Sequence, residues 1–174
     1  MNAPTFVDPD FDPVRVRERS AAVAAALPGV EWITDNRVER LSQDFYWFSP
    51  VLKRQLEGLR APAVGRPRTE DEVRAVVGAC AREGVAITPR GAGTGNYGQV
   101  VPLHGGVVID FGGLNRVAWV RPGAVRAQAG TRLADLDRAA REHGQELRLL
   151  PSTYRIASVG GLFAGGFGGI RHAL

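Results

Sequence analysis

The sequence of 174 residues has one cysteine, Cys80, and one lysine, Lys53. A single cysteine cannot form an intramolecular disulfide, and no set of cysteines and histidines has the spacing of a zinc site. We therefore expect a protein of a reducing compartment, the cytoplasm, without a structural metal. The absence of lysine after Lys53 also limits the kinds of phosphate-binding loop that the rest of the chain can contain.

Long apolar runs and blocks of like charge are missing as well. The longest weakly polar stretch, residues 156–170, has about fifteen residues, whereas a membrane-spanning helix needs roughly 20. The N-terminal letters MNAPTFVDPDFDP place proline and aspartate where a secretory signal needs a basic start and an apolar segment. The net charge of +4 comes from arginines scattered among 18 acidic residues. We expect no transmembrane segment, no export and no nucleic-acid partner.

What is present is the composition of a folded domain. Hydrophobic residues make up 44% of the chain and charged residues 23%, both close to the averages of globular proteins. Folding at this length removes roughly 70% of the unfolded surface from water, so a sizeable core is possible. The composition predicts one ordinary domain that is neither disordered nor fibrous.

The first sixty residues predict a helical extension. Residues 14–27 (VRVRERSAAVAAAL) are rich in alanine and free of glycine and proline, and Pro28 and Gly29 follow them, which is typical of a helix and its end. Four aromatic residues stand at 45–48. We expect them to anchor the extension by packing rather than to contact a ligand, because aromatic side chains bury large areas.

From residue 61 the pattern becomes that of a small α/β unit. A short apolar run leads into residues 69–84, where Thr69 and Glu72 predict a capping box and Gly84 predicts the end of a helix. Apolar residues recur there at helical spacing. We expect Cys80 to be a packing residue rather than a reactive thiol, because it belongs to this inner face. The predicted face comprises Val73, Val76, Val77, Cys80 and Ala81.

Strands are predicted on either side of a glycine-rich loop and again further along. Residues 85–88 (VAIT) and 105–111 (GGVVIDF) are short apolar runs of strand length. Residues 117–130 predict an antiparallel hairpin that turns at Pro122 and Gly123. A second capped helix is expected at 131–144. Its inner residues are expected to be Leu133, Leu136 and Ala140, with His143 near the carbonyls at its C-terminal end.

The glycine-rich loop reads PRGAGTGNYGQ over residues 89–99 and contains four glycines. Glycine lets backbone N–H groups approach an anion without a side chain in the way. A P-loop is excluded because no lysine follows. A Rossmann fingerprint is disfavoured, since glycines and Pro102 stand where its helix should run. The remaining device is a nest of loop amides that binds a diphosphate without a helix.

A second glycine-rich segment, PSTYRIASVGGLFAGGFGGI at 151–170, supports the nest. Two such loops would let a long ligand with a diphosphate lie close to the backbone. If three loop amides each contributed roughly 1.5 kcal/mol, the nest would supply about 4 to 5 kcal/mol, so further apolar contact with the ligand is implied. From the glycines alone, it is equally plausible that both segments are structural connections in a tightly curved sheet and bind no ligand.

Four segments, in the order in which they occur, resemble the FAD-binding (PCMH-type) domain of flavin oxidoreductases related to glycolate oxidase, D-lactate dehydrogenase and vanillyl-alcohol oxidase. The segments are PRGAGTGNYG, GGVVIDFGGLNRV, VRPGAVRAQAGTRLADLDRAAREHG and PSTYRIASVGGLFAGG. The resemblance covers about residues 61–169. It implies an α+β fold with a helical N-terminal extension at 1–60 and two α/β subdomains, at 61–115 and 116–174, of which the second is incomplete.

The resemblance also implies which residues bind FAD. In the family the first loop holds the pyrophosphate through backbone amides, with the hydroxyl of Thr94 adding a contact, and the second segment runs along the pyrophosphate towards the flavin. Some members attach FAD through a histidine where this chain has Thr94, so non-covalent binding is expected. The residues assigned to the cofactor are Pro89, Arg90, Gly91, Ala92, Gly93, Thr94, Gly95, Asn96, Gln99, Pro151, Ser152, Thr153, Ser158, Gly160, Gly161 and Gly165.

The activity implied by the resemblance is removal of hydride from a carbon that bears an oxygen, as in a 2-hydroxy acid, with FAD as the acceptor. Family domains continue beyond the point where this chain stops. We therefore expect the substrate to be bound through a missing C-terminal region or a second chain, and this chain to be inactive alone. Arg171 and His172 stand too near the end to be assigned a catalytic role. The alternative is a non-catalytic module that binds a nucleotide or a partner.

Overall fold

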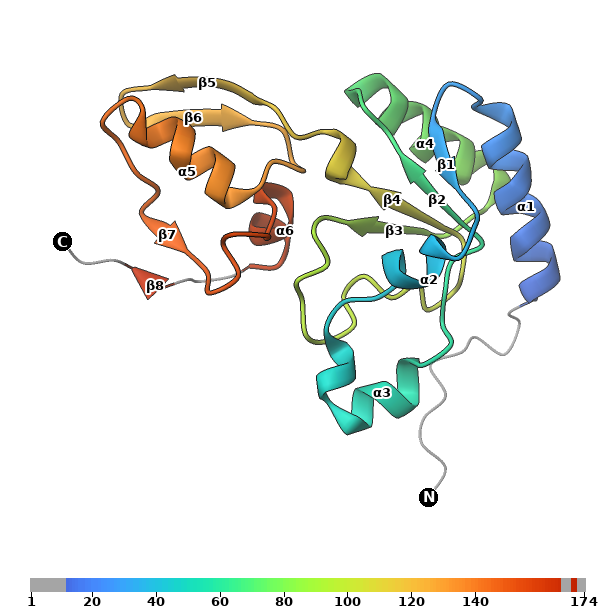
Figure 1. The fold of residues 1–174 in the computed structure, drawn as a ribbon. Helices are drawn as coiled ribbons and strands as arrows, with labels where there is room; N and C mark the ends of the chain where they lie inside the picture. Colours follow the sequence, from blue (N-terminus) through green and yellow to red (C-terminus); the bar gives the residue numbers. More distant parts are fainter. Residues whose placement is uncertain (1–11, 167–169, 172–174) are drawn as a thin grey trace.

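The structure, a computed structural model, describes residues 12–166, 170 and 171 (Figure 1). Its centre is a sheet of four strands in the order β1-β2-β4-β3. β2 and β3 both run parallel to β4, and β1 pairs with β2 in the antiparallel sense. The strands are β1 (Glu31–Ile33), β2 (Ala63–Arg66), β3 (Ile87–Arg90) and β4 (Val107–Asp110).

Helices cover both faces of this sheet, which explains why β4 is an uninterrupted apolar run. Alternate side chains of a strand point to opposite faces. Val107 and Ile109 pack in one cluster with residues of α1 (Pro13–Ala26) and α4 (Glu70–Glu83). Val108 packs in the other cluster, against residues of β2 and of α2 (Arg37–Leu41). The apolar strand predicted at 105–111 is therefore confirmed and buried on both sides.

Helix α4 follows the prediction at both ends, with one change in the cap. The Thr69 hydroxyl accepts a hydrogen bond from the Glu72 amide at 3.1 Å. The Glu72 carboxylate, however, accepts from the amide of Arg68 at 2.7 Å, one residue earlier than a reciprocal capping box requires. Gly84 ends the helix in the left-handed region, with φ of 60°. The predicted capping box is thus half correct.

The buried face of α4 is also rotated from the predicted one. Val76, Ala79 and Cys80 are buried, whereas Val77 and Ala81 are exposed. The buried and the exposed residues are all apolar and recur at helical spacing. Packing against β4 and α1 decides that Val76, Ala79 and Cys80 are the buried ones. Burial raises the pKa of the Cys80 thiol, which agrees with its predicted role in packing.

The region before residue 61 contains more than helices. β1 joins the sheet, and a 3-10 turn, η1 (Tyr46–Phe48), leads into α3 (Pro50–Leu56). Of the aromatic residues at 45–48, only Tyr46 is buried, in a cluster with Leu56 and Val101. Trp47 and Phe48 are stacked on each other and exposed, so the predicted packing anchor is confirmed for Tyr46 alone.

A second group of elements follows the sheet and lies to its side (Figure 1). After η2 (Phe111–Gly113), the predicted hairpin is present as β5 (Val117–Arg121) and β6 (Ala124–Ala127), with Gly123 at φ of 73° in the turn. The remaining elements are α5 (Leu133–Arg141), β7 (Leu149–Leu150), α6 (Val159–Ala164) and β8 (Ile170–Arg171).

Helix α5 has the predicted inner face but a different start. Leu133, Leu136 and Ala140 are buried, and Nδ1 of His143 lies 3.0 Å from the Ala139 carbonyl oxygen in the last turn. Thr131 does not cap the helix. Its hydroxyl is buried and donates to the carbonyl of Arg116 at 3.3 Å, and the N-cap position falls to the next residue without a side-chain bond. The helix therefore begins later than predicted and lacks a side-chain cap at its start.

Candidate functional site

Two parallel strands, β3 and β4, end at the same edge of the sheet. Arg90, the last residue of β3, stands in register with Asp110, the last residue of β4. Open α/β sheets bind ligands outside the carboxyl ends of their strands. A cavity of about 600 Å³ lies at this edge, lined by residues 90–92, by Asp110 and by Ser158, which belongs to the second glycine-rich segment. We call it the polar cavity.

The two glycine-rich segments meet beside the polar cavity. A Cβ atom at Gly91 would collide with the Ser158 hydroxyl and would also lie 3.5 Å from the backbone of Gly161. Ser158 is buried and caps α6, because its hydroxyl accepts from the Gly161 amide at 3.3 Å. Only glycine at position 91 therefore allows the first loop to lie against the start of α6.

The first loop presents backbone donors that have no partner. Within the described part of the chain, the amides of residues 92–96 donate no hydrogen bond. Further along, the amides of Tyr97, Gly98 and Gln99 are all bonded. Successive unbonded N–H groups in an irregular loop form a concave site for anions. The donors expected of a diphosphate nest are thus available at residues 92–96.

Arg90 supplies a fixed positive charge under this loop. The side chain is buried, and its Nη1 donates to the carbonyl of Gln43 at 2.7 Å. Gly93, at φ of 68°, lies against the guanidinium so closely that a Cβ atom there would collide with it. Burial lowers the pKa of Arg90, and the nearby Asp110 carboxylate opposes this. An arginine stays charged despite such a shift, because its ordinary pKa lies far above neutral pH.

Positive charge exceeds negative charge in the polar cavity. Arg40, Arg90 and Arg132 line it, and none of them forms an ion pair within the residues that the structure describes. The two carboxylates that line the cavity are already paired. Asp110 accepts from Arg66 at 2.8 Å, and Asp135 accepts from Arg138 at 2.5 Å. The cavity therefore suits an anionic group such as a diphosphate.

The residues predicted for the cofactor fall into three groups. Arg90, Gly91, Ala92 and Ser158 line the polar cavity. A second group does not line the cavity but follows these residues along the first loop and at the start of α6: Gly93, Thr94, Gly95, Asn96, Gln99, Gly160 and Gly161. The others do not line it either. They are Pro89 within β3, Pro151, Ser152 and Thr153 in a turn before α6, and Gly165 at the end of α6. Gly168, Gly169 and His172 lie outside the described residues.

Several lining residues were not predicted. Asp110 could have been found, since it is a charged residue at the end of a predicted apolar strand. Arg40 carries no such signal, because it belongs to a short helix far from the loop in sequence. The unpredicted lining residues are Arg40, Leu41, Asp110, Gly112, Asn115, Gly130, Arg132, Asp135 and Ile156.

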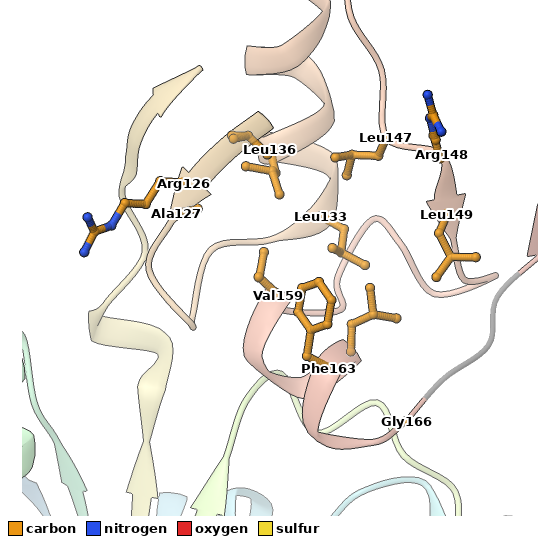
Figure 2. Close-up of a pocket in the computed structure, with 12 residues that line it drawn as sticks. Arg126, Ala127, Leu133, Leu136, Leu147, Arg148, Leu149, Val159, Phe163 and Gly166 are labelled. Atoms are coloured by element: carbon orange, nitrogen blue, oxygen red, sulfur yellow. The ribbon is translucent and has the colours of Figure 1, made fainter. Parts of the chain in front are cut away.

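A second cavity, of about 530 Å³, lies between β6, α5, β7 and α6 (Figure 2). We call it the apolar cavity. Leu133 and Leu136 of α5 face Val159 and Phe163 of α6 across it, while the guanidinium of Arg126 points away. It offers apolar contact surface without a charged group directed into it.

The described residues contain no group of three histidine, cysteine, aspartate or glutamate side chains that could hold a metal ion. None of the helices in the described part of the chain is both long and apolar enough to span a membrane.

Comparison with known proteins identifies the family to which the chain belongs. The family model described as "FAD binding domain" matches residues 61–174. The chain is 32% identical over 111 residues to a glycolate oxidase subunit of Bacillus subtilis (strain 168), covering 63% of this chain and 24% of the relative. It is 35% identical over 103 residues to a D-lactate dehydrogenase of Anaerostipes hadrus, covering 58% of this chain and 22% of the relative.

Among solved structures, an alkyldihydroxyacetonephosphate synthase shares the fold with a TM-score of 0.71 at 23% identity, over 94% of this chain and 34% of that one. The chain belongs to the FAD-binding domain family, and FAD is the cofactor of that family. The predicted fold class is confirmed. The chain spans about a quarter of the length of the curated relatives named here.

Proposed function

We propose that the polar cavity and the loop at residues 91–96 hold the diphosphate of FAD. The observation that carries this proposal is the row of unbonded amides at residues 92–96 beside the buried Arg90. Amides that bond to a charged oxygen form stronger hydrogen bonds than amides that bond to a neutral one. Arg90 supplies charge from below, and Arg40 and Arg132 supply it from the walls of the cavity.

FAD is bound without a covalent bond in this proposal. Thr94 stands where some family members carry a histidine, and residues 89–99 include neither histidine nor cysteine. Thr94 adds a hydroxyl to the row of amides instead. The second segment contributes Ser158, Gly160 and Gly161 as the wall against which the loop and the ligand lie.

The parent activity is the oxidation of a 2-hydroxy acid or a similar alcohol. The names of two relatives, a glycolate oxidase subunit and a D-lactate dehydrogenase, support this substrate class. When bound, FAD supplies the acceptor for hydride from the carbon that bears the hydroxyl group. The part assigned to this chain is to bind and orient the cofactor, and no catalytic residue is assigned within it.

A flavin absorption spectrum of the purified protein, recorded before and after addition of FAD, tests the cofactor. We expect a yellow protein that binds one FAD per chain, releases it on denaturation and prefers it over ADP. Equal binding of ADP and FAD would instead support a nucleotide-binding or partner-binding module that has no redox activity. The exposure of Phe163, at 78%, next to the apolar cavity is the observation that favours this second candidate.

The substrate class is tested with the protein purified from its native source, together with any subunit that accompanies it. Glycolate, D-lactate and D-2-hydroxyglutarate are each added without oxygen. We expect at least one of them to bleach the visible flavin absorption. Bleaching by a phenolic alcohol but by none of the three acids would contradict the proposed substrate class.

A further inference from the structure

A carboxylate from outside the family match reaches the first glycine-rich loop. Asp44 precedes residues 61–174, which the family model covers, and its side chain is 3% exposed. Its Oδ1 accepts hydrogen bonds from the amides of Tyr46 at 2.9 Å and Gly98 at 3.2 Å. Its Oδ2 accepts from the amide of Gln99 at 2.9 Å. One buried carboxylate thus joins the N-terminal region to the end of the loop.

The two neighbours of Asp44 hold other points of the same loop. The Gln43 carbonyl accepts from Arg90 Nη1 at 2.7 Å, at the start of the loop. The Phe45 amide donates to the Gly95 carbonyl at 2.8 Å, in its middle. Residues 43–45 therefore contact the loop at its beginning, middle and end.

The loop needs such support because its own sequence does not order it. It belongs to no helix or strand after Arg90, and Gly93 and Gly98 both have positive φ. Glycine loses more conformational freedom on ordering than any other residue. The amides of residues 92–96 contribute nothing to order before a ligand arrives, because they are unbonded. Much of the order must therefore come from contacts outside the loop.

We propose that Asp44 is a positioning residue for the FAD site. Its carboxylate fixes the amides of Gly98 and Gln99, and through them it holds the preceding amides in an arrangement ready to bind the diphosphate. Asp44 does not touch the cofactor itself. This inference rests on the proposed function for the ligand, but the ordering of the loop by Asp44 is independent of which anion binds.

The test uses two substitutions of different severity. Asp44→Asn keeps the shape of the side chain but turns one acceptor into an NH₂ group that faces a backbone N–H, so at least one of the three bonds is lost. Asp44→Ala removes all three. The matched control is Asp137→Asn. Asp137 is another buried aspartate, which accepts from the Leu147 amide at 3.0 Å and from Arg141 at 2.8 Å on α5, away from the loop.

Two measurements are made on each protein: amide hydrogen exchange without ligand, and FAD affinity by quenching of flavin fluorescence. For Asp44→Asn we expect faster exchange at Gly98, at Gln99 and through residues 92–96, with FAD bound about ten- to a hundredfold more weakly. Asp44→Ala should have the larger effect on both. Asp137→Asn should alter exchange near Leu147 and leave FAD affinity at the wild-type value.

The outcomes separate the inference from the proposed function. A wild-type protein that does not bind FAD would refute the proposed function, and the exchange data would still decide whether Asp44 orders the loop. Unchanged loop exchange in both Asp44 variants would overturn the inference. If the wild type does bind FAD, equal affinity in Asp44→Asn would overturn the inference as well. So would an equal loss of affinity in Asp137→Asn, since a general loss of stability would then explain the effect.

Discussion

The polar cavity and the apolar cavity have similar volumes, about 600 and about 530 Å³, but opposite contents. The polar cavity lies where parallel strands end and irregular loops begin, and it contains arginines that have no ion-pair partner, beside loop amides that have no hydrogen-bond partner, among the described residues. The apolar cavity lies between helix sides and short strands, and leucine, valine and phenylalanine side chains make up most of its lining (Figure 2).

Cavity volume alone therefore does not distinguish the two as candidate ligand sites. Only the polar cavity offers directional groups that can select a charged ligand. The apolar cavity offers contact area, and the strongly exposed Phe163 beside it is typical of a surface that packs against another segment or protein. Substitutions in the two cavities should therefore separate binding from stability.

The largest effect on binding is expected from Gly91→Val. The added side chain would collide with the Ser158 hydroxyl and press on the Gly161 backbone, which would force the two glycine-rich segments apart. FAD affinity should fall by more than about a hundredfold, and overpacking should cost about 1 to 3 kcal/mol of stability. Fluorescence titration and urea unfolding measure the two effects.

The control for this variant is Gly29→Val, because no atom lies within 4 Å of a Cβ atom built at Gly29. It should bind FAD as the wild type does. Wild-type affinity in Gly91→Val would show that the close approach of the two segments is not required for binding.

Leu133→Ala should show the reverse pattern. Leu133 is 2% exposed and lines the apolar cavity, so its truncation should cost about 2 to 4 kcal/mol of stability. FAD affinity, measured well below the unfolding transition, should not change by more than about twofold, a few tenths of a kcal/mol. A tenfold loss of affinity would mean that the two cavities are coupled.

Arg90→Met should weaken FAD binding by about 1.5 to 3 kcal/mol, since it removes a buried charge and leaves the Gln43 carbonyl without its donor. The dependence of affinity on salt should also become shallower. Arg126→Met, at the rim of the apolar cavity, is the matched control and should change neither quantity. An unaltered salt dependence in Arg90→Met would argue against Arg90 as a counter-charge.

The smallest effect is a dependence of stability on pH beside the apolar cavity. Burial works to raise the pKa of Asp137, but hydrogen bonds from Arg141 and from the Leu147 amide outweigh it, so the pKa is lowered in the folded state. A lowered pKa contributes stability above the unfolded value, near 3.9, that is lost as pH falls below it. Between pH 6 and about pH 3, the melting temperature of Asp137→Asn should therefore fall less than that of the wild type. An identical acid profile in both proteins would contradict the assignment.

Features that depend on neighbours in sequence were predictable. The hydroxyl of Thr69 caps α4, Gly84 ends it, and Pro122 and Gly123 turn the hairpin, because each acts within a few residues of its own position. The meeting of the two glycine-rich segments followed from the resemblance to a family. Local chemistry and a known order of motifs therefore account for the predicted part of the site.

Features that depend on packing were not predictable. β1 has only three residues and takes its place from pairing with β2. Val77 and Val76 are equally apolar, and only the position of β4 and α1 decides which of them is buried. Arg40 and Asp44 are brought to the site by the tertiary fold. They lie too far from the glycine-rich loop in sequence for a local pattern to predict this.

If FAD binds in the polar cavity as proposed, the three arginines there, which form no ion pair among the described residues, link the supply of cofactor to the stability of the fold. Without an anion they repel one another, and a ligand that binds only the folded state relieves that repulsion. A hundredfold excess of FAD over its dissociation constant would add about 2.7 kcal/mol to the free energy of unfolding. A cell short of flavin would then hold less of this protein because the empty form unfolds and is degraded sooner.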